Sequence, residues 1–186
     1  MQMNAASGFK TLFFTKEFHL IVTLVMALTV DGKIGRDPGH FPDWSGKEDK
    51  KLFAAISKKA GAVIMGSKTF DTFGKPLPYR KNIILTRNRD RQSKWPNLHF
   101  TNKDPGTILK DLEAEGYSEV ILAGGAWVNT LFAKANLIDN IILTISSKIF
   151  GTGLSLFTEA IDLDLELKSM DRIGENLVCL KYRVKK

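Results

Sequence analysis

Two short stretches, residues 63–70 (VIMGSKTF) and residues 120–126 (VILAGGA), decide how this sequence folds. Each begins with an apolar run of strand length, passes through glycine and leads into residues that favour a helix. A strand, a turn and a helix in succession form the repeating unit of α/β proteins, whose sheets are largely parallel. Because the carboxyl ends of parallel strands lie at one edge of a sheet, we expect both glycine turns at that edge.

The rest of the chain extends the same pattern. Further apolar runs predict strands at residues 20–30, 82–86 and 140–146, beside those at 62–65 and 120–123. Helix-like stretches lie between them, at residues 46–60, 68–73, 107–115 and 126–135. After Gly151 two strand-like segments, residues 161–170 and 176–184, follow each other across a turn at residues 171–175 without a helix. The sequence therefore predicts a three-layer α/β fold with a mixed, mostly parallel sheet that ends in an antiparallel hairpin.

The chain has 186 residues, which fits a single domain at residues 19–186. Residues 1–18 show no clear pattern, and we expect them to be an N-terminal extension or an extra edge element. The apolar run at residues 20–30 is about half the length that crosses a bilayer, and Asp31 follows it without a small-residue cleavage site. We therefore interpret this run as a buried strand and expect a cytoplasmic protein that does not bind membranes.

The charge balance and the metal-binding residue types narrow the choice of partners. Lys and Arg number 27 against 20 acidic residues, and this net charge of +7 suggests an anionic partner, either a nucleic acid, a membrane surface or a phosphate-bearing cofactor. A basic nucleic-acid-binding module is one alternative, and it would use the basic tail at residues 181–186. The aromatic residues are not interleaved with basic ones, however, so we expect no nucleic acid partner. Cys179 is the single cysteine, which excludes an internal disulfide, and we expect no metal site.

The first predicted helix contains one anomaly. Ser45 and Glu48 have the spacing of a capping box, and Gly61 is a natural stop signal. Leu52, Phe53, Ile56 and Ala60 form one apolar stripe along this helix. Asp49 falls in the middle of that stripe.

A carboxylate on an apolar face is costly unless something pairs with it. On a purely structural interpretation, Asp49 stabilises the helix because a negative charge in the first turn interacts favourably with the helix dipole. Glu48 already supplies such a charge on the exposed side of the helix. We therefore favour a functional role for Asp49.

The two glycine turns fit a dinucleotide, because a phosphate can approach a backbone that carries no side chain. Neither turn matches the G-x-G-x-x-G fingerprint, and each turn alone is better explained as a simple turn. Lys68 follows the first turn and Arg87 ends the neighbouring strand. Together with Ser67 they either hold an additional phosphate, as the ribose 2′-phosphate of NADP requires, or form a solvated basic pair.

These residues resemble a known family. Residues 63–70 and 74–87 are similar to the central block of dihydrofolate reductases, and residues 27–35 are similar to that family's first strand and the start of its active-site loop. Trp44, Asp49 and Phe53 reproduce the family's spacing of tryptophan, catalytic acid and helix phenylalanine.

Downstream, Gly124-Gly125 resembles a glycine pair that the family usually joins by a cis peptide, and Leu143-Thr144 resembles its pterin-supporting strand. The resemblance covers about residues 20–150.

Several positions depart from the family pattern. Ala126 replaces a third glycine, Asn129 replaces an aromatic residue, Ala123 replaces a larger aliphatic one, and Lys50 stands where an apolar residue is usual. Some of these positions, with the stretches at residues 31–34, 137–139 and 150–153, resemble instead the pyrimidine reductase of riboflavin biosynthesis, which has the same fold. Both interpretations imply NADPH, and they differ in the substrate.

The resemblance implies hydride transfer from NADPH to C6 of dihydrofolate with protonation of N5. It implies that Asp49 and Trp44 are the catalytic residues and that Asp49 orients the pterin. It also implies that Phe53 and Leu77 pack on the pterin rings and that Arg80 binds the carboxylate of the glutamate tail. From the pattern alone, the two apolar residues fit a core position and Arg80 fits a surface salt bridge equally well.

The resemblance also assigns the remaining positions of the site. The implied substrate-binding residues are Val25, Met26, Ala27, Asp49, Phe53, Phe73, Leu77, Arg80, Ala123 and Thr144. The implied cofactor-binding residues are Ala27, Ile34, Gly66, Ser67, Lys68, Thr69, Leu85, Thr86, Arg87, Gly124, Gly125, Ala126, Trp127 and Val128. We expect a monomer or homodimer with a small-molecule substrate.

Overall fold

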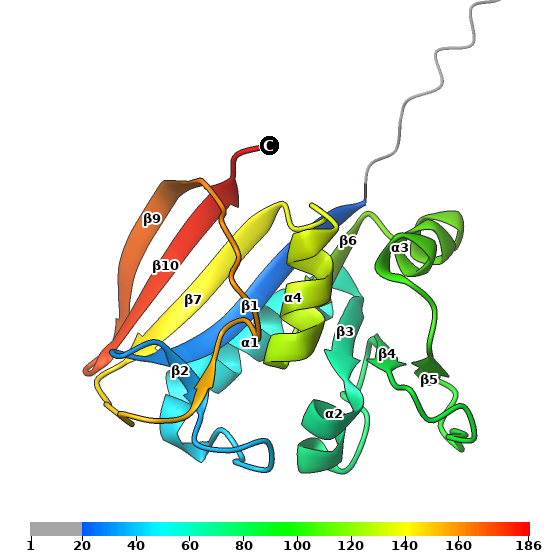
Figure 1. Ribbon diagram of the computed structural model, residues 1–186, viewed down its shortest axis with the longest axis horizontal. Coiled ribbons are helices and arrows are strands. Elements are labelled where there is room, and N and C mark those ends of the chain that lie inside the picture. The colour runs from blue at the N-terminus through cyan, green and yellow to red at the C-terminus, as the bar shows by residue number, and fades with distance from the viewer. Residues whose placement is uncertain (1–19) are drawn as a thin grey trace, which may run out of the picture.

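The structure is a computed structural model that describes residues 20–186, so the extension predicted at residues 1–18 lies outside the described residues. Eight strands form one sheet in the order β5-β4-β3-β6-β1-β7-β10-β9 (Figure 1). They are β1 (Ile21–Thr29), β3 (Ala62–Gly66), β4 (Lys81–Leu85), β5 (Leu98–Thr101), β6 (Glu119–Leu122), β7 (Asn140–Ser146), β9 (Leu165–Gly174) and β10 (Leu177–Val184). The strands from β5 to β7 are parallel, whereas β10 is antiparallel to both β7 and β9. This confirms the predicted mixed sheet with its C-terminal hairpin.

Helices cover both faces of the sheet. They are α1 (Lys47–Ala60), α2 (Ser67–Phe73), α3 (Pro105–Ala114) and α4 (Ala126–Lys134). One apolar cluster joins the sheet to α1 and α2, and a second joins the opposite face to α3 and α4. In Figure 1, α4 lies in front of the sheet and α1 behind it. Neighbouring residues such as Val63 and Ile64 enter opposite clusters, which explains why the strand is apolar throughout.

Three strands are absent from the sequence-based prediction. One of them is β5, which lies at one edge of the sheet and pairs in parallel with β4. His99 and Thr101 interrupt its apolar pattern. A separate antiparallel pair joins β2 (Lys33–Gly35) to β8 (Leu154–Ser155). Strands of two or three residues carry no readable periodicity, because their pairing is decided by the segment that they meet.

Two boundaries differ from the prediction. The capping box at Ser45 is wrong: α1 begins at Lys47, its N-cap is Gly46 at φ 90°, and no side chain caps it. The Ser45 hydroxyl instead donates to the carbonyl of Pro42 at 3.2 Å, within a short 3₁₀ turn at Asp43–Ser45. The C-terminal hairpin turns after Gly174, later than predicted, and its first strand begins only at Leu165. Gly61 ends α1 at φ 76°, as predicted.

Among residues 20–186, no helix is long and apolar enough to cross a membrane. The apolar run at residues 20–30 is instead β1, which lies between β6 and β7 inside the sheet.

Candidate active site

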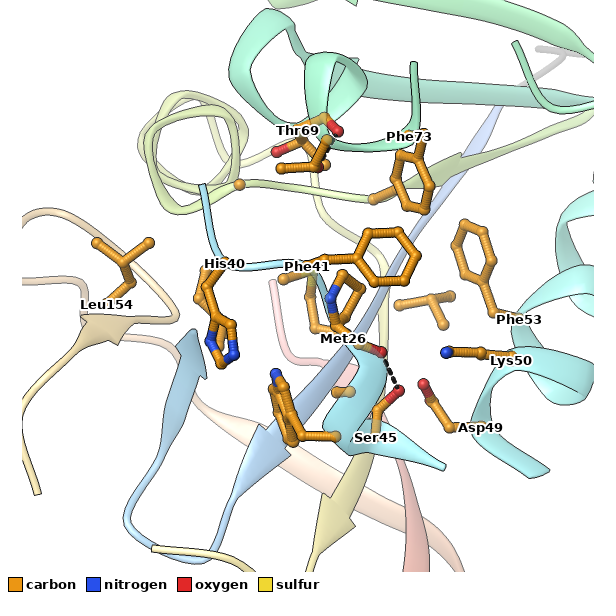
Figure 2. A pocket seen from close by; sticks show the side chains of 18 of the residues that line it. Met26, His40, Phe41, Ser45, Asp49, Lys50, Phe53, Thr69, Phe73 and Leu154 are labelled. Atoms are coloured by element: carbon orange, nitrogen blue, oxygen red, sulfur yellow. Dashed lines mark hydrogen bonds between the residues drawn. The ribbon is translucent and has the colours of Figure 1, made fainter. Parts of the chain in front are cut away.

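A cavity of about 320 Å³ opens beside the carboxyl-terminal half of β1, between that strand, α1 and α2. All the predicted substrate-binding residues except Thr144 line it, together with the predicted cofactor-binding residues Ile34, Thr69 and Gly125. Residues from β1, α1, α2 and the turn after β6 therefore meet at one place, although they lie far apart in the sequence. Figure 2 shows this convergence around the cavity.

Asp49 lies in the first turn of α1, half-buried, and lines the cavity. Thr144, which is 3% exposed on β7, lies behind it and donates its hydroxyl proton to Oδ1 of Asp49. Oδ2 has no hydrogen-bond partner within residues 20–186. Thr144 therefore occupies one acceptor position of the Asp49 carboxylate, and Oδ2 and the second lone pair of Oδ1 stay available to a ligand.

Trp44, the second predicted catalytic residue, is buried in the cavity wall, and its ring packs edge to face on Phe150 with the two ring centres 5.2 Å apart. Its indole N–H is buried and has no partner among the described residues. A buried donor without a partner is costly, and a ligand or a water molecule in the cavity is the natural acceptor.

Arg80 is only 6% exposed and lines the cavity from the turn before β4. Its Nε donates to the carbonyl of Pro78 at 2.9 Å and its Nη1 donates to the hydroxyl of Ser57. No carboxylate within residues 20–186 pairs with it, and its side chain is buried where the alternative interpretation expected a surface salt bridge. Burial lowers the pKa of the Arg80 guanidinium, yet this group stays charged in proteins. The site thus holds a buried cation with unused donors.

Three phenylalanine side chains form the apolar wall of the cavity. The three rings turn toward one another in Figure 2. Phe53 belongs to α1, Phe73 belongs to α2, and Phe41 lies in the loop between β2 and α1. The rings of Phe41 and Phe73 pack edge to face, with their centres 6.2 Å apart. A flat, apolar wall of this kind suits an aromatic ligand.

Sequence reasoning missed several residues of this wall. The loop after β2 contributes Asp37, Pro38, His40, Phe41 and Pro42, and Leu154 of β8 lines the same cavity. Within this loop the main-chain N–H of Arg36 donates to Nδ1 of His40 at 3.0 Å. The loop sequence contains no strand or helix pattern, so nothing in it signals that it would fold over the cavity.

Lys50 also lines the cavity, although the prediction treated it only as a departure from the family pattern. Its side chain points into the same space as that of Asp49 (Figure 2). Its ammonium nitrogen lies 5.4 Å from the centre of the Phe41 ring, and no carboxylate within the described chain pairs with it.

The predicted cofactor edge is formed by the two glycine turns, which lie side by side. The N–H of Gly66 donates to the carbonyl of Gly124 at 2.8 Å, and Gly124 and Gly125 are joined by a cis peptide, as the resemblance implied. Gly124 has φ 79°, and a side chain there would lie 2.9 Å from the sulfur of Met26. Both turns thus leave bare main chain at one edge of the sheet.

The remaining predicted cofactor residues surround this edge. Ser67 and Lys68 begin α2, Thr86 and Arg87 follow β4, and Ala126 and Trp127 begin α4. The side chains of Leu85 and Val128 are buried in the core. Lys68 and Arg87 are exposed and have no ion-pair partner in residues 20–186, and the Arg87 guanidinium lies 5.7 Å from the Trp127 ring.

A second, polar hollow adjoins Arg87 at the carboxyl ends of β4 and β5. Its lining comprises Thr86, Asn88, Arg89, Arg91, Phe100, Thr101 and Asn102. Of these residues the prediction named only Thr86, because β5 and its position beside β4 were not foreseen. Among residues 20–186, no cluster of His, Cys, Asp or Glu is suited to hold a metal ion.

The sheet order, the cavity beside β1 and the paired glycine turns define the class of the protein as a dihydrofolate reductase-like α/β fold. The chain matches the sequence profile of the family described as Dihydrofolate reductase over residues 21–163. It belongs to that family.

Known relatives and structures agree with this assignment. The chain is 33% identical to a type 3 dihydrofolate reductase of Salmonella typhimurium over 119 residues, which cover 62% of this chain and 65% of that protein. A dihydrofolate reductase of Enterococcus faecalis complexed with NADP(H) has a TM-score of 0.68 at 23% identity, with 91% of this chain and 99% of that chain covered.

A diaminohydroxyphosphoribosylaminopyrimidine deaminase/5-amino-6-(5-phosphoribosylamino)uracil reductase of Thermotoga maritima has a TM-score of 0.73 at 18% identity. The match covers 90% of this chain and 57% of that one. The structural likenesses show the fold that these proteins share.

Proposed function

We propose that this protein catalyses the NADPH-dependent reduction of 7,8-dihydrofolate to tetrahydrofolate. The observation that carries the proposal is a single cavity in which a free carboxylate oxygen of Asp49 and the unpaired guanidinium of Arg80 face the same space. Asp49 and Ser57, the residue that holds Arg80, are eight positions apart on α1, or about 12 Å along the helix axis. This separation suits an elongated ligand with donors at one end and an anion at the other.

The residues of the cavity would bind and orient such a substrate. The two carboxylate oxygens of Asp49 would accept hydrogen bonds from the 2-amino group and N3–H of the pterin, while Thr144 keeps the carboxylate in place. The ring would lie against Phe53 and Leu77, and Arg80 would bind the α-carboxylate of the glutamate tail through two parallel N–H groups. The indole N–H of Trp44 supplies a further donor at the ring.

The cofactor edge fits NADPH in two respects. The adjoining glycine turns expose main chain that a pyrophosphate can approach, and the exposed cations of Lys68 and Arg87, with Ser67, would hold the 2′-phosphate. When bound, NADPH supplies the hydride for C6 of the substrate. The Enterococcus faecalis relative of the same fold is itself complexed with NADP(H).

A steady-state assay tests the proposal. Purified protein is mixed with NADPH and 7,8-dihydrofolate, and oxidation of NADPH is followed by its absorbance. We expect turnover that depends on both compounds and is lost when NADPH is replaced by an equal concentration of NADH. Absence of turnover with dihydrofolate would contradict the proposed substrate.

A second candidate activity is NADPH-dependent reduction of 5-amino-6-(5-phosphoribosylamino)uracil. Lys50 favours it, because its unpaired ammonium stands in the wall that would face the apolar p-aminobenzoyl group of a folate. A sugar phosphate would accept hydrogen bonds from that ammonium. The same assay with the pyrimidine as substrate distinguishes the two activities.

The wider context follows from this proposal. We propose a single catalytic domain at residues 19–186 that acts in the cytoplasm as a monomer or homodimer on a small-molecule substrate, without nucleic acid or membrane partners.

A further inference from the structure

Ser57 is the only fully buried residue of α1, at 0% exposure. This is unusual for an amphipathic helix, because the apolar residues Leu52, Phe53 and Ile56 on the same helix are only half-buried. A buried hydroxyl is costly unless both its donor and its acceptor capacity are used. Its position on α1 therefore calls for an explanation beyond helix packing.

The hydrogen bonds of Ser57 supply that explanation. Its Oγ donates to the carbonyl of Phe53 at 2.5 Å, one helical turn earlier, so the hydroxyl proton is committed. The lone pairs of Oγ are then available, and Nη1 of Arg80 donates to them. Ser57 thus presents a fixed acceptor to a guanidinium that has no carboxylate partner in residues 20–186.

The main chain of Arg80 is held independently of Ser57. Asn82, at 0% exposure, donates from Nδ2 to the carbonyls of Arg80 and Leu77, both at 2.9 Å, and accepts from the N–H of Leu77 at 2.9 Å. Asn97 donates to the Arg80 carbonyl at 3.2 Å. These bonds fix the turn, so removal of the Ser57 hydroxyl releases Nη1 of Arg80 while the turn and the bond from Nε to the Pro78 carbonyl stay in place.

We propose that Ser57 is a positioning residue that sets the orientation of the Arg80 guanidinium. A guanidinium has five N–H donors, and Pro78 and Ser57 take one each. Three N–H groups remain, one on Nη1 and two on Nη2, and Arg80 lines the cavity. With Nε and Nη1 held, one N–H from each of the two terminal nitrogens would donate to a planar carboxylate at the anionic end of the substrate. The inference rests on the proposed function in one respect, namely that the substrate carries such an anion.

The first test compares two substrates in steady-state kinetics. Ser57→Ala should raise KM for 7,8-dihydrofolate by about tenfold and leave kcat and KM for NADPH unchanged. KM for a 7,8-dihydropterin that lacks the p-aminobenzoylglutamate tail should not change. Ser57→Thr, which keeps the hydroxyl, should restore KM for dihydrofolate to within about twofold of wild type.

The matched control is Thr23→Val, which removes another buried hydroxyl. Thr23 is 2% exposed and donates to Glu119 at 3.1 Å, near the amino-terminal end of β1 and outside the lining of the cavity. This variant should leave KM for both pterins unchanged. In an Arg80→Ala background, Ser57→Ala should have no further effect on KM for dihydrofolate, because the two residues act as one unit.

Three results would overturn the inference. KM for dihydrofolate could be unchanged in Ser57→Ala, or KM could rise equally for both pterins. Ser57→Ala could also raise KM for dihydrofolate as much in the Arg80→Ala background as in the wild type. A second measurement keeps the inference separate from the proposed function. If the wild type reduces neither pterin, the proposed function fails. The side-chain ¹⁵N signals of Arg80 then report on positioning, because Ser57→Ala should speed hydrogen exchange and rotation of the guanidinium, and unchanged signals would contradict the role.

Discussion

At the scale of single residues, the Thr144 hydroxyl donates one hydrogen bond to the Asp49 carboxylate, whose remaining acceptor positions are left for a ligand. Asp49→Asn should keep the fold, because a neutral amide of the same shape can still accept from Thr144. It should lower turnover at neutral pH by about 100-fold or more, since the amide cannot accept from two pterin donors at once. Turnover should partly recover in acid, where solvent protonates dihydrofolate. A pH profile of kcat/KM checks this, and rates like those of the wild type at every pH would assign orientation of the pterin to another residue.

Arg80 is the residue on which the choice of substrate depends most directly. Arg80→Ala should raise KM for dihydrofolate by about 10- to 100-fold, because a charge-assisted pair of hydrogen bonds is lost, and should affect KM for NADPH less. Arg80→Lys should restore KM for dihydrofolate only in part, since an ammonium cannot donate two parallel hydrogen bonds to one carboxylate. Dihydrofolate turnover that survives Arg80→Ala unchanged would favour the pyrimidine as the substrate.

Ala123 and Lys50 change the pocket that diaminopyrimidine antifolates would occupy. A small side chain at position 123 removes apolar contact worth roughly 1–3 kcal/mol, and an ammonium at position 50 replaces an apolar surface. We expect weak inhibition by trimethoprim, which would amount to antifolate resistance, and a lower inhibition constant in Lys50→Leu with Ala123→Ile. Nanomolar inhibition of the wild type would contradict this expectation.

At the scale of elements, the start of α2 and the end of β4 bring Lys68 and Arg87 to the cofactor edge because β3 and β4 are adjacent parallel strands. The double variant Lys68→Ala with Arg87→Ala should remove about 2–4 kcal/mol of NADPH binding and leave NADH binding nearly unchanged. Equilibrium titration of both cofactors measures this. Lys103→Ala is a suitable control, because it removes an exposed lysine that pairs with Asp111 on α3. An NADPH preference that persists in the double variant would place the 2′-phosphate elsewhere.

At the scale of the whole molecule, the cofactor edge combines residues that follow β3, β4 and β6, and the native sheet is required to assemble it. NADPH should therefore bind the folded state and not the unfolded chain, which at 100 times Kd adds about 2.7 kcal/mol to the free energy of unfolding. For a chain of this length the gain corresponds to a rise in Tm of roughly 5–10 °C. Thermal unfolding with increasing NADPH tests this, with NADH at equal concentration as the control. An unchanged Tm with NADPH would contradict the cofactor.

The sequence by itself determined the sheet strands with long apolar runs, the four helices and the anomaly at Asp49. These features are local: β3 and β6 are apolar on both faces, and a carboxylate within an apolar stripe is visible without knowledge of its neighbours. Only the tertiary structure decided that Arg80 is buried on Ser57, that Lys50 faces the cavity, and that the loop at residues 36–42 closes one side of it. Each of these facts depends on a contact between segments distant in sequence, and residue type and spacing carry no information about which distant segment a side chain will meet.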